Sequence, residues 1–116
     1  MDINDNKIEL AKMAVEFWRV LKVFDKHLTN YPPDNKTASV VRNAERKLLS
    51  ILEESNLKLV IYDGQIYSPN LAVTIVNNDD FSENENLIVG NTLEPTILCD
   101  GRLLHIGKAI LIKKEG

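Results

Sequence analysis

The candidates for nucleophilic catalysis in this chain are a cysteine and two histidines, Cys99, His27 and His105. Cys99 is expected at the end of a short strand and His105 in the next strand, so a hairpin could bring them together. Such catalysis needs a base within hydrogen-bonding distance of the nucleophile and a group that orients the base. A lone cysteine in a strand is far more often a small buried apolar residue. We therefore predict no catalytic residue and no enzymatic activity.

Oxygen ligands for a metal ion are concentrated in one segment, residues 77–86, which carries Asp79, Asp80, Glu83 and Glu85. These residues lack the spacing and the central glycine of an EF-hand loop, so we predict a solvated loop and no metal site. The glycines are scattered and are interpreted as turns or bulges, not as a phosphate-binding loop. No cofactor is expected.

The charge balance argues against nucleic acid as a partner. The chain has 14 basic and 17 acidic residues and a net charge of -3. Proteins that bind nucleic acid usually carry an excess of Lys and Arg on one face. The densest charge here is acidic and would repel phosphate.

The single cysteine, the acidic start of the chain and the absence of a long apolar run bear on location. One cysteine cannot form an internal disulfide and fits a reducing compartment. Residues 1–6 are polar and acidic, unlike the basic start of a signal peptide. No apolar run approaches the roughly 20 residues that a membrane span needs. We expect a cytoplasmic protein without a membrane partner.

Helical periodicity predicts two helices in the first half. The first runs from about Lys7 to Leu28, and the second from residue 36 or 37 to Ser55. Pro32 and Pro33 break the helix between them, and Asn56 is suited to end the second. On the second helix we expect an apolar inner face with charged residues outside it. The inner face comprises Val41, Ala44, Leu48, Ile51, Leu52 and Ser55, and the outer residues include Arg42, Glu45, Arg46, Glu53 and Glu54.

After Asn56 the pattern changes to short runs rich in β-branched residues. The expected strands are 57–62, 71–76, 87–89, 96–99, 102–106 and 109–113. Two Asp-Gly pairs, at 63–64 and 100–101, favour tight type I′ turns. The chain is thus predicted to be α+β: an antiparallel helical hairpin over residues 1–56, and a small all-β domain over residues 57–116.

Two segments of the predicted hairpin, residues 20–28 and 48–59, resemble the GrpE family, the nucleotide exchange factors of DnaK-type chaperones. Residues 20–28, VLKVFDKHL, look like the family segment LLPVLDNLERAL. Residues 48–59, LLSILEESNLKL, are similar to LLDVLEKFGVEV, with Asn56 in place of a glycine.

The β-part continues the resemblance. Residues 64–71, GQIYSPNL, resemble the family hallmark GEPFDPNLHEA, and residues 101–111, GRLLHIGKAIL, fit GRVLRPAKVVV without a gap. Four similar motifs in the correct order cover roughly residues 16–113. Three departures stand out: Ala72-Val73-Thr74 replaces the family's His-Glu-Ala, His105-Ile106 replaces Arg-Pro, and only about 15 residues precede the match where the family has a long stalk helix.

The resemblance implies a function without catalysis: the β-domain would dock on the ATPase domain of a DnaK-like chaperone and hasten ADP release. Matched positions place partner contacts on Tyr67, Arg102 and Leu111, with Pro69 and Asn70 in the hallmark motif. Three of these residues also have a simpler structural interpretation: Tyr67 as a half-buried strand residue, Arg102 as a surface charge and Leu111 as a core residue.

A homodimer is expected from the wide apolar arc of the first helix and from the family's habit of pairing hairpins into a four-helix bundle. The residues assigned to dimerisation are Phe17, Trp18, Leu21, Phe24, Leu28 and Leu48. The alternative function is a GrpE-like adaptor or scaffold that binds a different protein without exchange activity.

Overall fold

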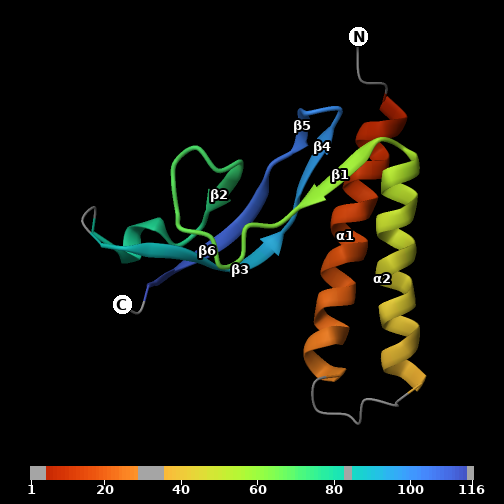
Figure 1. The fold of residues 1–116 in the computed structure, drawn as a ribbon, viewed down its shortest axis with the longest axis horizontal. Coiled ribbons are helices and arrows are strands. Elements are labelled where there is room, and N and C mark those ends of the chain that lie inside the picture. Colours follow the sequence, from red (N-terminus) through yellow and green to blue (C-terminus); the bar gives the residue numbers. More distant parts are fainter. Residues whose placement is uncertain (1–4, 29–35, 83–84, 115–116) are drawn as a thin grey trace. The chain divides into compact units, whose positions relative to one another are not determined.

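The computed structural model describes residues 5–28, 36–82 and 85–114 and confirms the predicted α+β class (Figure 1). Two helices come first, and six short strands in two small sheets follow. In chain order the elements are α1 (Asp5–Leu28), α2 (Lys36–Glu54), β1 (Leu57–Val60), β2 (Val73–Ile75), the short 3-10 helix η1 (Asn78–Asp80), β3 (Leu87–Glu94), β4 (Thr96–Cys99), β5 (Arg102–His105) and β6 (Gly107–Lys113).

The chain divides into two compact units, Met1–Lys58 and Leu59–Gly116, called here the hairpin unit and the β-unit. In the hairpin unit α1 and α2 lie side by side and run in opposite directions (Figure 1). The buried residues of α1 form one stripe at helical spacing, because positions three and four apart share a face. They are Ala11, Ala14, Val15, Trp18 and Leu21.

The inner face of α2 differs from the prediction at two positions. Its buried residues are Ala38, Val41, Leu48 and Leu52. The remaining place in that three-and-four spacing is taken by Glu45, which was predicted to lie outside and is only partly exposed. Ile51, predicted to lie inside, is 41% exposed. The stripe is shifted toward Ala38 and Glu45, which brings a carboxyl group to the face that packs on α1.

The end of α2 follows the prediction. Asn56 has φ 62°, the left-handed conformation that commonly ends a helix and that Asn tolerates better than most residues. Its N–H donates to Glu53 O at 3.0 Å, which satisfies one of the last carbonyl groups of the helix.

The strands form two three-stranded sheets, with the orders β1-β4-β5 and β2-β6-β3. β6 is central in the second sheet, parallel to β2 and antiparallel to β3. A core of Val89, Ala109 and Leu111 lies on one face of this sheet, all at 1% exposure or less. Seven partly buried apolar side chains cover it: Tyr62, Tyr67, Leu71, Val73, Ile75, Phe81 and Leu87.

One of the two predicted Asp-Gly turns is confirmed and the other is wrong. Asp100 and Gly101 have φ 51° and 81°, as a type I′ hairpin between β4 and β5 requires. At the other pair only Gly64 has a positive φ, 82°, while Asp63 does not. Gln65 N–H bonds Tyr62 O at 3.0 Å there, in a turn that needs the left-handed conformation at its third residue alone.

β3 is longer than predicted because Gly90 does not end it. The strand continues to Glu94, with shifts of register between Val89 and Asn91 and between Thr92 and Glu94. A bulge lets a strand absorb an extra residue and continue pairing. A Cβ at Gly90 would lie 2.6 Å from Ile112 Cγ2, so the bulge also brings the backbone close to a β6 side chain.

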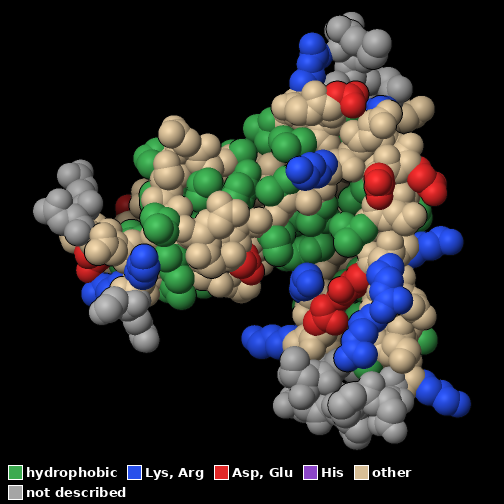
Figure 2. All heavy atoms as spheres, viewed as in Figure 1, with side chains coloured by type: hydrophobic (Ala, Val, Ile, Leu, Met, Phe, Trp, Pro, Cys, Tyr) green, Lys and Arg blue, Asp and Glu red, His purple; other side chains and the backbone are tan. Residues whose placement is uncertain are grey.

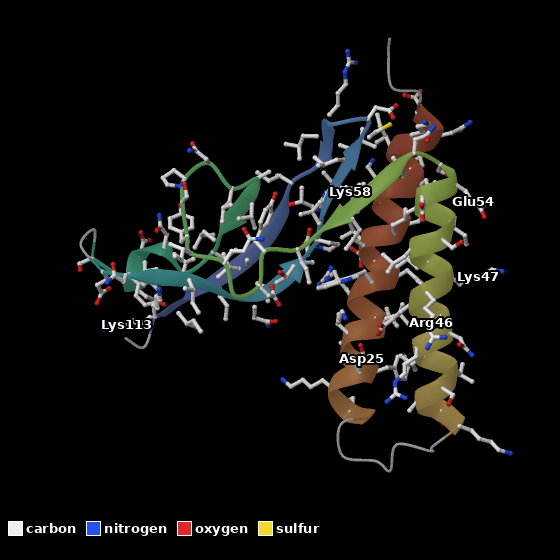
Figure 3. The ribbon with its side chains drawn as sticks, viewed as in Figure 1. Asp25, Arg46, Lys47, Glu54, Lys58 and Lys113 are labelled. Carbon is white, nitrogen blue, oxygen red and sulfur yellow. The ribbon has the colours of Figure 1, made fainter. Side chains whose placement is uncertain are left out.

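The buried carboxyl of Glu45 generates a prediction about the hairpin. Its Oε1 is buried, and no described residue offers it a hydrogen bond of normal geometry. Burial, together with Asp25 of α1 (Figure 3), raises the pKa of Glu45, against the opposing effect of Lys22 and Arg42. A raised folded-state pKa means that the stabilisation is full below the unfolded-state pKa and is lost as the pH rises through the folded-state pKa.

We expect Glu45→Gln to stabilise the protein at pH 7 by about 1 kcal/mol, since the neutral amide avoids the buried charge. The gain should shrink at acid pH. Urea unfolding followed by circular dichroism at 222 nm, repeated across the pH range, measures it. Glu54→Gln on the exposed side of α2 is the control. An unchanged pH profile in Glu45→Gln would contradict the prediction.

Candidate protein-binding surface

The segment that carries three of the predicted partner-binding residues is held to the edge of β3. Gly64 N–H donates to Val89 O at 2.7 Å, Val89 N–H to Gln65 O at 2.9 Å, and Tyr67 N–H to Leu87 O at 2.9 Å. These bonds flank an isolated antiparallel bridge between Ile66 and Ile88 and hold the start of this segment beside β3. It is therefore fixed in position and not a loose loop.

Tyr67, Pro69 and Asn70 have different environments. Tyr67 is half-buried and packs on the core of Val89, Ala109 and Leu111. Pro69 and Asn70 are exposed at the following turn. Ser68 shapes this turn, because its hydroxyl accepts from Asn70 N–H at 3.2 Å and its carbonyl from Leu71 N–H at 3.0 Å.

The two other predicted partner-binding residues lie elsewhere. Arg102 is exposed at the start of β5, opposite Cys99 in the β1-β4-β5 sheet, whereas Tyr67 packs on the β2-β6-β3 sheet. Leu111 is 1% exposed at the centre of β6, so its side chain is part of the core and is not available to a partner. Of the two interpretations of Leu111, partner contact and core residue, the structure agrees with the core residue.

A hollow of about 900 Å³ lies beside Tyr67 and Pro69. Apolar side chains, including Ile66, Phe81 and Leu87, form much of its lining, and Asp79, Glu85 and Lys114 contribute charges. The complete lining is Ile66, Tyr67, Pro69, Asn78, Asp79, Phe81, Ser82, Glu85, Asn86, Leu87 and Lys114. The lining is mixed, with polar and apolar side chains in similar amounts, so the hollow could contact both kinds of group in a partner.

The part of the lining formed by Asn78, Asp79 and Phe81, called here the wall, is attached to β6 by the preceding residue, Asn77. Its side-chain amide donates to Leu111 O at 2.9 Å and its Oδ1 accepts from Leu111 N–H at 2.8 Å. The paired bonds attach the start of η1 to β6 as a further strand residue would. Phe81, directly after η1, then packs on the core. Residues 77–81 of the acidic segment, which was predicted to be a solvated loop, are therefore held against the β-unit.

The charge of Glu85 is fixed in the same lining. Its Oε1 lies 3.0 Å from Lys113 Nζ, and its Oε2 accepts from Ser82 N–H at 3.0 Å. The hydrogen bond from Lys113, labelled near the end of β6 in Figure 3, is the main cause that lowers the pKa of Glu85, with the Ser82 bond second. Glu85 therefore stays ionised and compensated by Lys113.

Cys99 and His105 are not cross-strand partners. Cys99 pairs in register with Arg102 and is 4% exposed, while His105 stands opposite Ile97. The His105 imidazole Nε2 lies 2.9 Å from Glu94 Oε1, and Glu94 Oε2 lies 3.7 Å from Lys108 Nζ. This arrangement is a charged network on the β-unit, and it does not orient His105 toward a nucleophile.

The described residues hold no metal-binding cluster and no membrane-spanning helix. Within residues 5–28, 36–82 and 85–114 there is no group of three His, Cys, Asp or Glu side chains suited to a metal ion, and Glu83 lies outside these ranges. Neither helix is long and apolar enough, in its described part, to cross a membrane. On the face shown in Figure 2, the described Lys and Arg side chains are spread over both units.

The residues assigned to dimerisation divide into two groups. Trp18, Leu21 and Leu48 are at most 9% exposed, so they are covered within the chain, whereas Phe17 and Phe24 are 45% and 48% exposed. The side chain of Leu28 lies outside the described part.

Sequence reasoning assigned Phe17 and Phe24 to the apolar arc of α1 but missed two exposed apolar residues beside them. Met13 and Val20 are 69% and 51% exposed and continue the line of Phe17 and Phe24. Successive members of this line are four, three and four residues apart, the spacing of a coiled-coil seam.

Comparison of the chain with family models, with curated proteins and with solved structures found no match. The candidate binding surface is therefore defined by the positions of its own residues and by no relative. Sequence reasoning identified Tyr67 and Pro69, but it missed Ile66, Asn77 and Phe81. The alternation of polar and apolar residues in segment 64–67 could have indicated that Ile66 lies beside Tyr67 in a strand-like segment. No local sequence feature indicates that Asn77 bonds to Leu111.

Proposed function

We propose that the protein is a GrpE-like nucleotide exchange factor that binds the ATPase domain of a DnaK-like chaperone through its β-unit and promotes ADP release. The order of a two-helix hairpin followed by two small sheets supports this proposal, together with the four motifs in sequence. The observation that carries it is the hollow beside Tyr67 and Pro69, which lies at the hallmark motif.

The proposed mechanism is a shift between two states of the chaperone. The factor binds the open, nucleotide-poor state of the ATPase domain better than the closed state, and the population moves toward the open state. By linkage, nucleotide weakens the binding of the factor by the same ratio. Tyr67, Pro69, Asn70 and Arg102 are the proposed contact residues; Leu111 is omitted because its side chain is buried.

We expect the full chain to accelerate release of fluorescently labelled ADP from a DnaK-like chaperone of the same cell. Arg102→Ala should reduce the acceleration roughly tenfold, because exposed arginines are often dominant contacts in interfaces. Stopped-flow fluorescence measures the release rate.

Arg46→Ala, which removes an exposed arginine of α2 (Figure 3), is the matched control and should leave the rate unchanged. If the wild-type chain changed neither ADP release nor the mobility of the chaperone in a binding assay, the proposal would be wrong.

We also propose that the hairpin unit forms a homodimer through the exposed stripe of Met13, Phe17, Val20 and Phe24. Apolar side chains with this spacing pack between helices of two chains in coiled coils and four-helix bundles. The buried Trp18, Leu21 and Leu48 shape the hairpin beneath that surface.

We expect the protein to be dimeric at micromolar concentrations, and the double variant Phe17→Glu with Phe24→Glu to be monomeric, because buried unpaired carboxylates would oppose association. Light scattering coupled to size-exclusion chromatography measures the mass. Lys47→Glu, on the exposed side of α2, should remain dimeric. A monomeric wild-type chain across this range contradicts the proposal.

A second candidate function is that of an adaptor that binds a different protein without nucleotide exchange. The environment of residues 72–74, which replace the family's His-Glu-Ala, favours it. Ala72 O accepts from the Thr96 hydroxyl, and Val73 packs on the core of the β-unit. Ala72 and Val73 are used within the fold, and the exposed Thr74 offers a partner one hydroxyl and not a polar pair. Capture of a partner of another class, with unchanged ADP release, would select this function.

A further inference from the structure

We propose that the hollow of the β-unit binds an extended segment of a partner protein, with a large apolar side chain in the hollow and a neighbouring Lys or Arg against Asp79. The backbone of that segment pairs with the backbone of Ile66. Three features of the described residues converge on this occupant: an unused strand edge, apolar side chains on one part of the lining, and a carboxylate, Asp79, that forms no ion pair.

The unused strand edge is the backbone of Ile66. Ile66 and Ile88 face each other across an antiparallel bridge, and the flanking bonds join Tyr67 N–H to Leu87 O and Val89 N–H to Gln65 O. In such a non-hydrogen-bonded pair the N–H and C=O of both residues point away from each other. The Ile66 N–H and C=O are therefore directed to the outside of the sheet, where neither has a partner in the described part of the chain.

An outward-facing backbone pair at a strand edge is the feature that an extended peptide uses when it adds a strand to a sheet. The Ile66 side chain is 66% exposed, so the approach to this edge is open on the described surface. Its backbone is held in extended form by the bonds on the other side, so little ordering entropy is lost when a peptide pairs there.

The apolar lining is already formed. Tyr67, Phe81 and Leu87 line the hollow with part of their surface and pack on the core of Val89, Ala109 and Leu111 with the rest. Pro69 adds a rigid apolar edge. A hollow of about 900 Å³ has room for a Phe or Leu side chain and the adjoining backbone of a peptide.

The charges select a cationic neighbour for that side chain. Glu85 is compensated by Lys113 at 3.0 Å. Asp79 lines the hollow and is exposed, and it forms no ion pair within the described ranges. Asp80 follows it on the same short helix, and Lys114 is the one cation of the lining. Asp79, Asp80 and Glu85 against Lys113 and Lys114 leave a net charge of -1 on the hollow and its rim, which favours Lys or Arg in the bound segment.

This inference deepens the proposed function, because it names the chemistry that the β-unit would recognise in a partner. It can be tested without a chaperone. Failure of the exchange assay would leave peptide binding intact, and failure of peptide binding would leave exchange through other contacts.

The experiment is a titration of the ¹⁵N-labelled full chain with a blocked hexapeptide of sequence glycine, lysine, phenylalanine, lysine, valine, glycine. We expect saturable shifts of the amides of Ile66, Tyr67 and Phe81, with a dissociation constant on the order of 100 μM. A peptide with glutamates in place of the lysines should bind about tenfold more weakly.

Two pairs of variants test the separate features. Ile66→Pro removes the outward N–H, which the fold does not use, and should weaken binding about fivefold, whereas Ile66→Val should not. Asp79→Asn should weaken binding about threefold, whereas Asp80→Asn, outside the lining, should have a smaller effect. The amide spectrum of each variant reports whether it is folded.

The proposal is overturned if the lysine peptide causes no saturable shift, or if the shifted amides lie away from the hollow. It is also overturned if folded Asp79→Asn and Ile66→Pro bind as the wild type does, because neither the charge nor the strand edge would then contribute.

Discussion

The β-unit depends on the close crossing of two backbone segments at Gly107. Residues 94–96 lead from the β2-β6-β3 sheet to the β1-β4-β5 sheet, and Gly107 lies where the chain returns. A Cβ at Gly107 would be 2.7 Å from Pro95 C and 2.8 Å from Thr96 N, so only glycine fits. The buried Thr96 hydroxyl accepts from Gly107 N–H at 2.9 Å and donates to Ala72 O.

This crossing determines where the binding surface is formed. It sets the register of β6, which places Ala109 and Leu111 in the core and Leu111 opposite Asn77. One side of the hollow is thus attached to β6 through Asn77, and the segment of residues 64–67 is attached to β3. A surface held in this way is suited to binding with little loss of conformational entropy, which is consistent with a protein whose proposed activity is association.

Local chemistry predicted much of the fold. Asn56 ends α2, and Asp100-Gly101 forms the type I′ turn, because both need a left-handed backbone that few residues accept. The errors arise where distant contacts override local preference. Gly90 continues β3 because a bulge beside Ile112 accommodates it. Glu45 faces α1 although charged residues favour solvent, because the stripe of α2 is set by its packing on α1.

The candidate site was predictable in part for the same reason. Tyr67 and Pro69 belong to one motif. Phe81 lines the same hollow because Asn77, close to it in sequence, is bonded to Leu111, which lies 34 residues further along the chain. Hydrogen exchange of the full chain, measured with and without a nucleotide-free DnaK-like chaperone, shows which part of the β-unit docks. If the proposed surface is the one used, exchange slows at residues 65–70 and 78–82. Unchanged exchange in these segments, or protection confined to the two helices, would contradict the proposed surface.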